Sequence, residues 1–132
     1  MKTNVNVEFV FEADYLDIDD ISDTLGLEPT NTWEKGDLIK DRPVVRKQSC
    51  WSIGTGNKES LDINDQLFEM IEMLKGKEGI INNISKKYDT TPFFMILINI
   101  EDDEKPIISI YSPIIKFASS INAHLEIDWY IY

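Results

Sequence analysis

The sequence predicts a single α+β domain, residues 1–132, in which a mostly antiparallel sheet carries its helices on one face. Two observations lead to this fold class. Segments that alternate apolar and polar residues indicate half-buried strands, and segments whose apolar residues lie three or four positions apart indicate helices between them. Of the 132 residues, 42% are hydrophobic, so a core of ordinary globular composition can form without a metal or a disulfide.

The first half of the chain predicts a strand, a helix and two further strands. Valine and phenylalanine occupy every second position at residues 5–11, which indicates the first strand. A helix should follow, with Asp17 as its N-cap and Gly26 as the left-handed residue that ends it. Two short strands, at residues 32–39 and 49–53, should then form a hairpin with a long charged tip.

The middle of the chain predicts helical segments followed by two strands. A second helix should begin at Asp62, with an additional short helix around residues 80–84. The continuous apolar run at residues 92–101 is typical of a central strand that is covered on both faces. We expect that strand to pair with residues 107–111 as an antiparallel hairpin.

The end of the chain predicts one more helix and one more strand. Ser112 and Pro113 are a strong signal for a helix start, and residues 124–132 alternate as a final strand. The expected order is therefore β-α-β-β-α-β-β-α-β. A helix end precedes an aromatic-bearing strand in both halves, at Trp33 and at Trp129. The order and this similarity predict two ferredoxin-like halves that share one sheet.

The charge of the chain predicts a basic partner. The formal net charge is −11, which disfavours broad nucleic-acid binding, because such binding needs many Lys and Arg side chains on phosphate. An acidic protein attracts basic partners instead, although solubility alone also explains the charge. The carboxylates gather at the start of the first helix and at a later turn. The predicted partner-binding residues are Asp17, Asp19, Asp20, Asp23, Asp102, Asp103 and Glu104.

A second candidate site is the predicted hairpin, which places aromatic residues beside a cluster of cations. Aromatic faces next to cationic side chains can hold a planar or phosphorylated ligand by stacking and charge. Packing is the stronger alternative explanation, with an indole in the core and a solvated basic loop around it. The ligand-binding residues that the pattern predicts are Trp33, Lys35, Arg42, Arg46, Lys47 and Trp51.

Neither a catalytic site nor a metal site is predicted. The chain has one His and one Cys, and it has no phosphate loop, dinucleotide fingerprint or nucleophile-elbow motif. A catalytic pair of Cys50 and His124 would need their two strands to be adjacent. One His with one Cys cannot complete a tetrahedral zinc site without carboxylates. No cofactor is therefore expected.

The chain is expected in the cytoplasm. Polar residues interrupt the first ten positions, so no signal peptide is predicted. The longest apolar run falls far short of the roughly 20 residues that a membrane helix needs. A single cysteine is consistent with a reducing compartment.

Four segments of the chain resemble one known family. They are LGLEPT at residues 25–30, TWEKGD at residues 32–37, the pair Trp51 and Ser52, and LEIDWYIY at residues 125–132. In these segments the chain resembles the bacterial family of domain of unknown function 4279. The resemblance implies a small stand-alone cytoplasmic protein, and it attaches no catalytic role to any residue.

These observations together favour a non-enzymatic protein-binding module. Its concrete form would be an immunity-type protein that neutralises a basic toxin by docking an acidic face. The alternative is a small-ligand or anion-binding domain that uses the hairpin from Trp33 to Trp51. Homodimerisation through an exposed sheet edge or the aromatic C-terminal strand would explain Trp129, Tyr130 and Tyr132 without a ligand.

Overall fold

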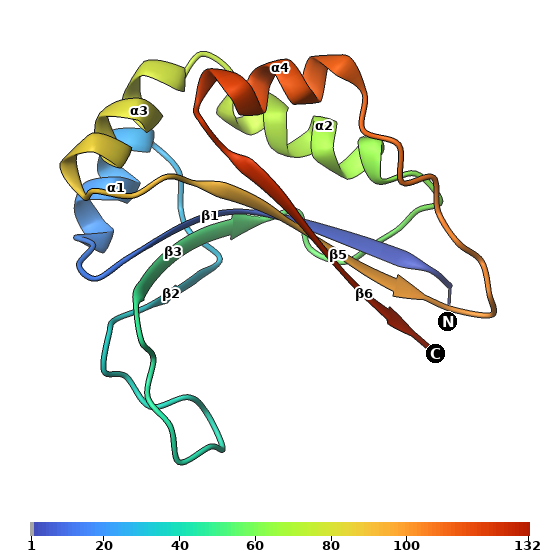
Figure 1. Cartoon of the computed structure of the whole chain (residues 1–132), viewed down its shortest axis with the longest axis horizontal. Helices are drawn as coiled ribbons and strands as arrows, with labels where there is room; N and C mark the ends of the chain where they lie inside the picture. The colour runs from blue at the N-terminus through green and yellow to red at the C-terminus, as the bar shows by residue number, and fades with distance from the viewer. Residues whose placement is uncertain (1) are drawn as a thin grey trace.

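The computed structural model describes residues 2–132, and it contains one mixed sheet with four helices on one of its faces (Figure 1). The α+β class predicted from the sequence is confirmed. The strands are β1 (Asn4–Ala13), β2 (Asn31–Trp33), β3 (Ser49–Gly54), β4 (Lys58–Glu59), β5 (Phe93–Ile100) and β6 (His124–Ile131). The helices are α1 (Ile18–Leu25), α2 (Ile63–Leu74), α3 (Glu78–Lys87) and α4 (Ser112–Ser120).

The strand order shows one ferredoxin-like unit with an addition. The main path of the sheet is β2-β3-β1-β5-β6, and its neighbours are antiparallel except for the parallel pair β5 and β6. From β1 to β5 the chain follows the split β-α-β-β-α-β connectivity, with β3 and β4 together in the place of the third strand and α2 and α3 together in the place of the second helix. Only α4 and β6 follow. Two ferredoxin-like halves are therefore not confirmed.

The core lies between the sheet and the helix layer. Alternate side chains of β1, from Val5 to Phe11, are fully buried against the helices, which is the period-two pattern that the sequence predicted. Phe9 packs edge to face on Phe11, with 5.2 Å between ring centroids. The fully buried helix residues that meet this face include Ile21, Ile63, Leu67, Met70, Leu74, Ile81 and Ile114.

The helix ends follow the predicted signals. The Asp17 carboxylate accepts a hydrogen bond from the Asp20 N–H (3.1 Å), and Gly26 ends α1 with a left-handed φ of 69°. Asp62 caps α2 by accepting from the Asn64 N–H (3.0 Å). The helix α3 is longer than the expected residues 80–84. Within residues 2–132, no helix combines the length and the apolar character that a membrane span requires.

The predicted strand at residues 107–111 is wrong. This segment leaves the sheet and crosses to the helix layer, where Ile107 makes an isolated bridge to Asp62. The Asn64 side chain donates to the Ser109 carbonyl (2.6 Å) and accepts from the Tyr111 N–H (3.2 Å). These bonds take the place of a strand ladder, and β5 pairs with β6 instead. The predicted position of β5 inside the sheet is confirmed, because β1 and β6 pair with it on either side. Helices cover only one face of β5, however, and not both.

The hairpin between β2 and β3 bends away from the sheet (Figure 1). The predicted strand at residues 32–39 is shorter than expected, because Gly36 adopts a φ of 95° that interrupts an extended chain. A ladder resumes beyond it, where the Arg46 N–H donates to the Asp37 carbonyl (2.7 Å) and the Gly36 N–H donates to the Arg46 carbonyl (2.9 Å). The hairpin is therefore ordered, although it projects from the body of the domain.

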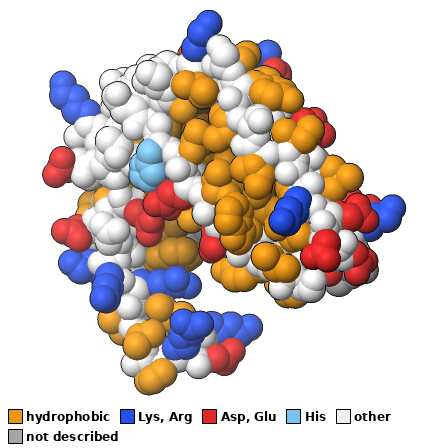
Figure 2. Space-filling view, turned by 45° about the vertical axis from the view of Figure 1, so that its right-hand side comes forward, with side chains coloured by type: hydrophobic (Ala, Val, Ile, Leu, Met, Phe, Trp, Pro, Cys, Tyr) orange, Lys and Arg blue, Asp and Glu red, His pale blue; other side chains and the backbone are white. Residues whose placement is uncertain are grey.

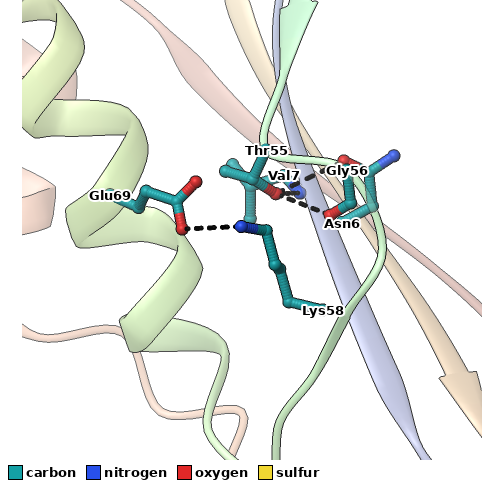
Figure 3. A network of polar contacts seen from close by, with 6 residues as sticks. All are labelled: Asn6, Val7, Thr55, Gly56, Lys58 and Glu69. Atoms are coloured by element: carbon teal, nitrogen blue, oxygen red, sulfur yellow. Dashed lines mark hydrogen bonds and ion pairs between the residues drawn. The ribbon is translucent and has the colours of Figure 1, made fainter.

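A bulge divides the extended segment that contains β3 and β4. Both strands pair with β1, but the register shifts by one residue between them. Gly56 supplies the positive φ (78°) that such a bulge needs. The Thr55 hydroxyl accepts from the Val7 N–H (3.1 Å) and donates to the Gly56 carbonyl (2.9 Å), as Figure 3 shows. Lys58 then forms a 3.8 Å ion pair with Glu69, which ties β4 to α2.

We expect Trp51→Ala to lower the free energy of unfolding by about 3–5 kcal/mol, because it empties a large core position. Trp51 is fully buried, and its indole N–H donates to the Ser22 hydroxyl (3.0 Å). Urea unfolding followed by circular dichroism measures the change. Leu38→Ala is the control, since Leu38 is 75% exposed, and it should change the value by no more than about 0.5 kcal/mol. Equal effects of the two variants would contradict this placement of Trp51.

Candidate functional site

The face of the sheet that the helices leave uncovered forms a groove with the projecting hairpin. Two adjoining hollows, of about 190 and 350 Å³, lie on this open face and share Glu12 and Trp33. A third hollow of about 510 Å³ joins Trp33 to the start of α1. Lys and Arg side chains gather on the hairpin, opposite Asp and Glu side chains on the body of the molecule (Figure 2). Trp33 is therefore the centre of the candidate site.

Trp33 is half-buried and carries a cation on its ring. It pairs with Cys50 across β2 and β3, so its side chain lies on the open face. The Arg46 guanidinium lies over the indole, 3.8 Å from the ring centroid. Such a contact contributes about 0.5–1 kcal/mol on a solvated surface. The hairpin ladder holds the Arg46 backbone, so the folding of the hairpin itself positions this cation.

Glutamates lie on the open face at the groove. Glu8 and Glu12, from β1, line the smaller hollow. Glu126 comes from β6, which is separated from β1 by β5. Burial raises the pKa of the Glu8 carboxyl above its usual value, and a hydrogen bond with Asn31 opposes this shift. Burial also raises the pKa of Glu12; the negative charge of Glu126 adds to the shift, and Arg46 opposes it. The open face thus holds carboxylates whose charge is only partly compensated.

Apolar side chains lie among these carboxylates. Val10, Phe93 and Met95 line the smaller hollow. The Phe93 ring stacks on the His124 ring, with 5.1 Å between centroids and 16° between planes. His124 also lies 3.3 Å from a Glu126 carboxylate oxygen. Such a surface, with apolar contacts surrounded by negative charge, suits a cationic group that carries hydrocarbon or aromatic parts.

The structure separates the residues of the predicted ligand site. Trp51 lies on the helix side of the sheet and is fully buried, so it does not share a surface with Trp33. Lys35 makes a 3.5 Å ion pair with Asp14. Lys47 lines the 350 Å³ hollow, whereas Arg42 is exposed on the hairpin. Of the predicted residues, the structure brings together Trp33, Arg46 and Lys47.

The predicted acidic residues at the start of α1 have different roles. Asp17 and Asp19 line the 510 Å³ hollow beside Trp33, which joins them to the candidate site. Asp20 instead accepts hydrogen bonds from Lys87 (2.9 Å) and Tyr88. The bond from Tyr88, followed by the one from Lys87, lowers the pKa of Asp20. Asp23 is exposed on α1.

The acidic turn at Asp102, Asp103 and Glu104 lies far from this groove. The Thr3 hydroxyl donates to the Glu104 carbonyl (2.6 Å), which places the turn at the beginning of β1. The helix α1 follows the other end of β1. This strand has ten residues, so its two ends are roughly 33 Å apart. The two predicted acidic regions therefore do not form one surface.

Cys50 and His124 do not form a pair. β1 and β5 lie between their strands, a separation of roughly 14 Å at the usual strand spacing. Burial raises the pKa of the Cys50 thiol to about 12, and repulsion from Glu12 and Glu8 adds to this shift. The reactive thiolate is therefore scarce at neutral pH. Among residues 2–132, no group of three or more His, Cys, Asp or Glu side chains is placed to hold a metal ion.

Sequence reasoning missed several residues of the open face, among them Glu8, Glu12, Phe93 and Glu126. The alternation in β1 did indicate that Glu8 and Glu12 lie on the side opposite the buried phenylalanines. Phe93 and Glu126 could be assigned to the same face only once the parallel pairing of β5 and β6 was known. No local signal in the chain specified that pairing.

We expect Glu12→Gln to stabilise the protein at pH 7 and to have little effect near pH 4. Folding raises the pKa of this carboxyl, so ionisation costs stability once the pH exceeds the folded-state value. Below the ordinary glutamate pKa of about 4.3, the carboxyl is protonated in both the folded and the unfolded state. Thermal unfolding at the two pH values measures the difference. Glu28→Gln, at an exposed position, is the control; an equal gain for both variants would contradict the proposed cause.

Comparison with protein families matches residues 2–132 to the family described as domain of unknown function 4279 (DUF4279). No curated protein and no solved structure matches the chain. The family match confirms the resemblance found in the sequence and covers essentially the whole chain. The chain therefore belongs to the DUF4279 family.

Proposed function

We propose that this protein is a non-enzymatic binding module that docks a basic segment of a partner protein in its open-face groove. The observation that carries the proposal is the set of carboxylates on the open face: Glu8 and Glu12, which line the groove, and Glu126, whose negative charge acts on Glu12. The pKa of Glu8 and that of Glu12 are both raised, chiefly by burial. A cation that binds beside them would lower both pKa values and recover the cost of that burial.

The shape of the groove favours a polypeptide over a small molecule. The hollows that adjoin Trp33 are shallow and open to solvent, and they extend from the sheet to the hairpin and to α1. An extended segment can lie along such a surface, with Lys or Arg side chains at the carboxylates and apolar groups on Phe93 and Met95. The net charge of −11 would accelerate the encounter with a basic partner.

The hairpin supplies the adaptable side of this groove. Arg46 stacks on Trp33 (3.8 Å), where a guanidinium of the partner could take its place. Arg46 would then turn toward solvent or toward a carboxylate of the partner. This exchange is a means of specificity, because a partner has to present a planar cation at the right distance from its other contacts.

An immunity-type protein that neutralises a basic toxin is the biological form of this function that we favour. Blocking a cationic cleft requires an acidic surface but no catalytic residues. The small-ligand alternative fits less well in its anion-binding form, because the carboxylates of Glu8, Glu12, Asp17 and Asp19 line the hollows around Trp33. These charges would repel a phosphorylated ligand.

We expect a hexa-arginine peptide to perturb the amide resonances of β1, β2 and the hairpin more strongly than those of the turn at residues 102–104. The triple variant Glu8→Gln, Glu12→Gln and Glu126→Gln should weaken this binding about tenfold or more, since tenfold corresponds to about 1.4 kcal/mol. Nuclear magnetic resonance titration at low salt measures both the location and the affinity.

The matched control removes the same number of charges at the far end of β1. Asp102→Asn, Asp103→Asn and Glu104→Gln together should leave the peptide affinity within about twofold, the effect of net charge alone. Equal weakening by both triple variants would refute the groove as the binding site. With the native lysate, a basic protein should be retained by the control and lost by the groove variant; retention by both would contradict the proposal as well.

A further inference from the structure

The strand β6 forms a long free edge of the sheet. It pairs with β5 on one side, and no other strand of residues 2–132 pairs with it on the other side. The opposite edge is β2, which has three residues and is followed by the projecting hairpin. β6 has eight residues and contains no proline or lysine that would block a second strand. The side of the molecule that bears this edge is strongly hydrophobic (Figure 2).

The apolar side chains of β6 are poorly covered by the helix layer. Ile127, Trp129 and Ile131 lie on the same side of the sheet as the buried isoleucines of β5. They nevertheless remain 40%, 53% and 66% exposed. Ile115 of α4 is also 53% exposed. Single exposed apolar residues are ordinary, but three in a row on a free edge strand indicate a surface that another chain covers.

The backbone of β6 is ready to accept another strand. The Tyr132 N–H donates to the Ile100 carbonyl (2.9 Å), so the even-numbered residues of β6 direct their backbone groups toward β5. Successive residues of a strand point these groups to opposite sides. The N–H and C=O groups of Ile127, Trp129 and Ile131 are therefore directed outward.

We propose that this protein forms a symmetric dimer in which β6 pairs antiparallel with β6 of a second copy, with Trp129 on the twofold axis. The charge pattern selects this register. A register centred on Ile127 would place Glu126 opposite Asp128, and one centred on Asp128 would place this aspartate opposite itself. Like charges directly opposite each other are destabilising. A register centred on Glu126 would likewise place this glutamate opposite itself. Registers centred before Glu126 or beyond Trp129 pair fewer residues of β6.

The register centred on Trp129 places no two carboxylate side chains opposite each other. It pairs Ile127 with Ile131 of the second copy on the helix side. On the open face it places Asp128 opposite Tyr130, whose hydroxyl already donates to Asp128 within one chain (3.1 Å). Residues 126–132 take part, a ladder of roughly 23 Å. The two indoles meet on the axis, where a large aromatic side chain contributes most to an interface.

Sedimentation velocity tests the dimer. The wild-type protein should show a mass that rises from 15.3 kDa toward twice that value as its concentration increases. Trp129→Asp places two like charges on the axis, so it should raise the dimer dissociation constant about 30-fold or more, equivalent to about 2 kcal/mol. Leu38→Asp adds the same charge at a 75% exposed position on the hairpin, and it should dimerise like the wild type.

Disulfide trapping tests the register. An antiparallel hydrogen-bonded pair has its Cα atoms about 5.5 Å apart, within the range that a disulfide spans. A mixture of the Ile127→Cys and Ile131→Cys variants should form a covalent dimer on oxidation, whereas each variant alone should form far less. The wild type is the control, because Cys50 is buried.

Three outcomes would overturn the proposal. A monomeric wild type at every concentration would exclude the dimer. Equal dissociation of Trp129→Asp and Leu38→Asp would exclude β6 as the interface. Covalent dimers in either single-variant sample, as abundant as in the mixture, would exclude the register centred on Trp129.

Discussion

The architecture depends on one constraint: helices cover only one face of the sheet. In the central strand β1, alternate side chains such as Val7 and Phe9 are fully buried beneath the helices, while Glu8 and Glu12 lie on the other face. A slip of one residue would bury the glutamates and expose the phenylalanines, so the hydrophobic effect fixes the register. The same register of β1 places the partly buried carboxylates of Glu8 and Glu12 on the open face. The candidate site is thus a direct consequence of how the core forms.

Sequence patterns within short segments predicted the helix ends, which depend on contacts between residues that are close in the sequence. The caps at Asp17 and Asp62 and the left-handed Gly26 bracket real helix ends, because each satisfies backbone groups within a few residues. The error at residues 107–111 has a non-local cause. Its alternation resembles a strand, but Asn64, more than forty residues earlier, binds its backbone. No pattern within residues 107–111 reports that contact.

The difference between contacts within one segment and contacts between distant segments also explains how much of the site could be predicted. Trp33 was found from its own segment, and the hairpin brings Arg46 to it. Trp51 was grouped with Trp33 because both lie in the hairpin strands. The antiparallel register places Trp33 opposite Cys50, however, and therefore puts Trp51 on the buried face. A register is a property of two segments, so the sequence of either one is insufficient to assign the faces of both.

The two proposed surfaces interact through charge. Each copy carries a net charge of −11, so electrostatic repulsion between two copies opposes their association at β6. Glu126 belongs to both regions, because its charge acts on Glu12 and it lies on β6, the strand of the proposed dimer interface. A basic segment bound in the groove would neutralise charge near the proposed twofold axis and would thereby favour dimerisation. By thermodynamic linkage, the proposed dimer would then bind that segment more tightly than the monomer.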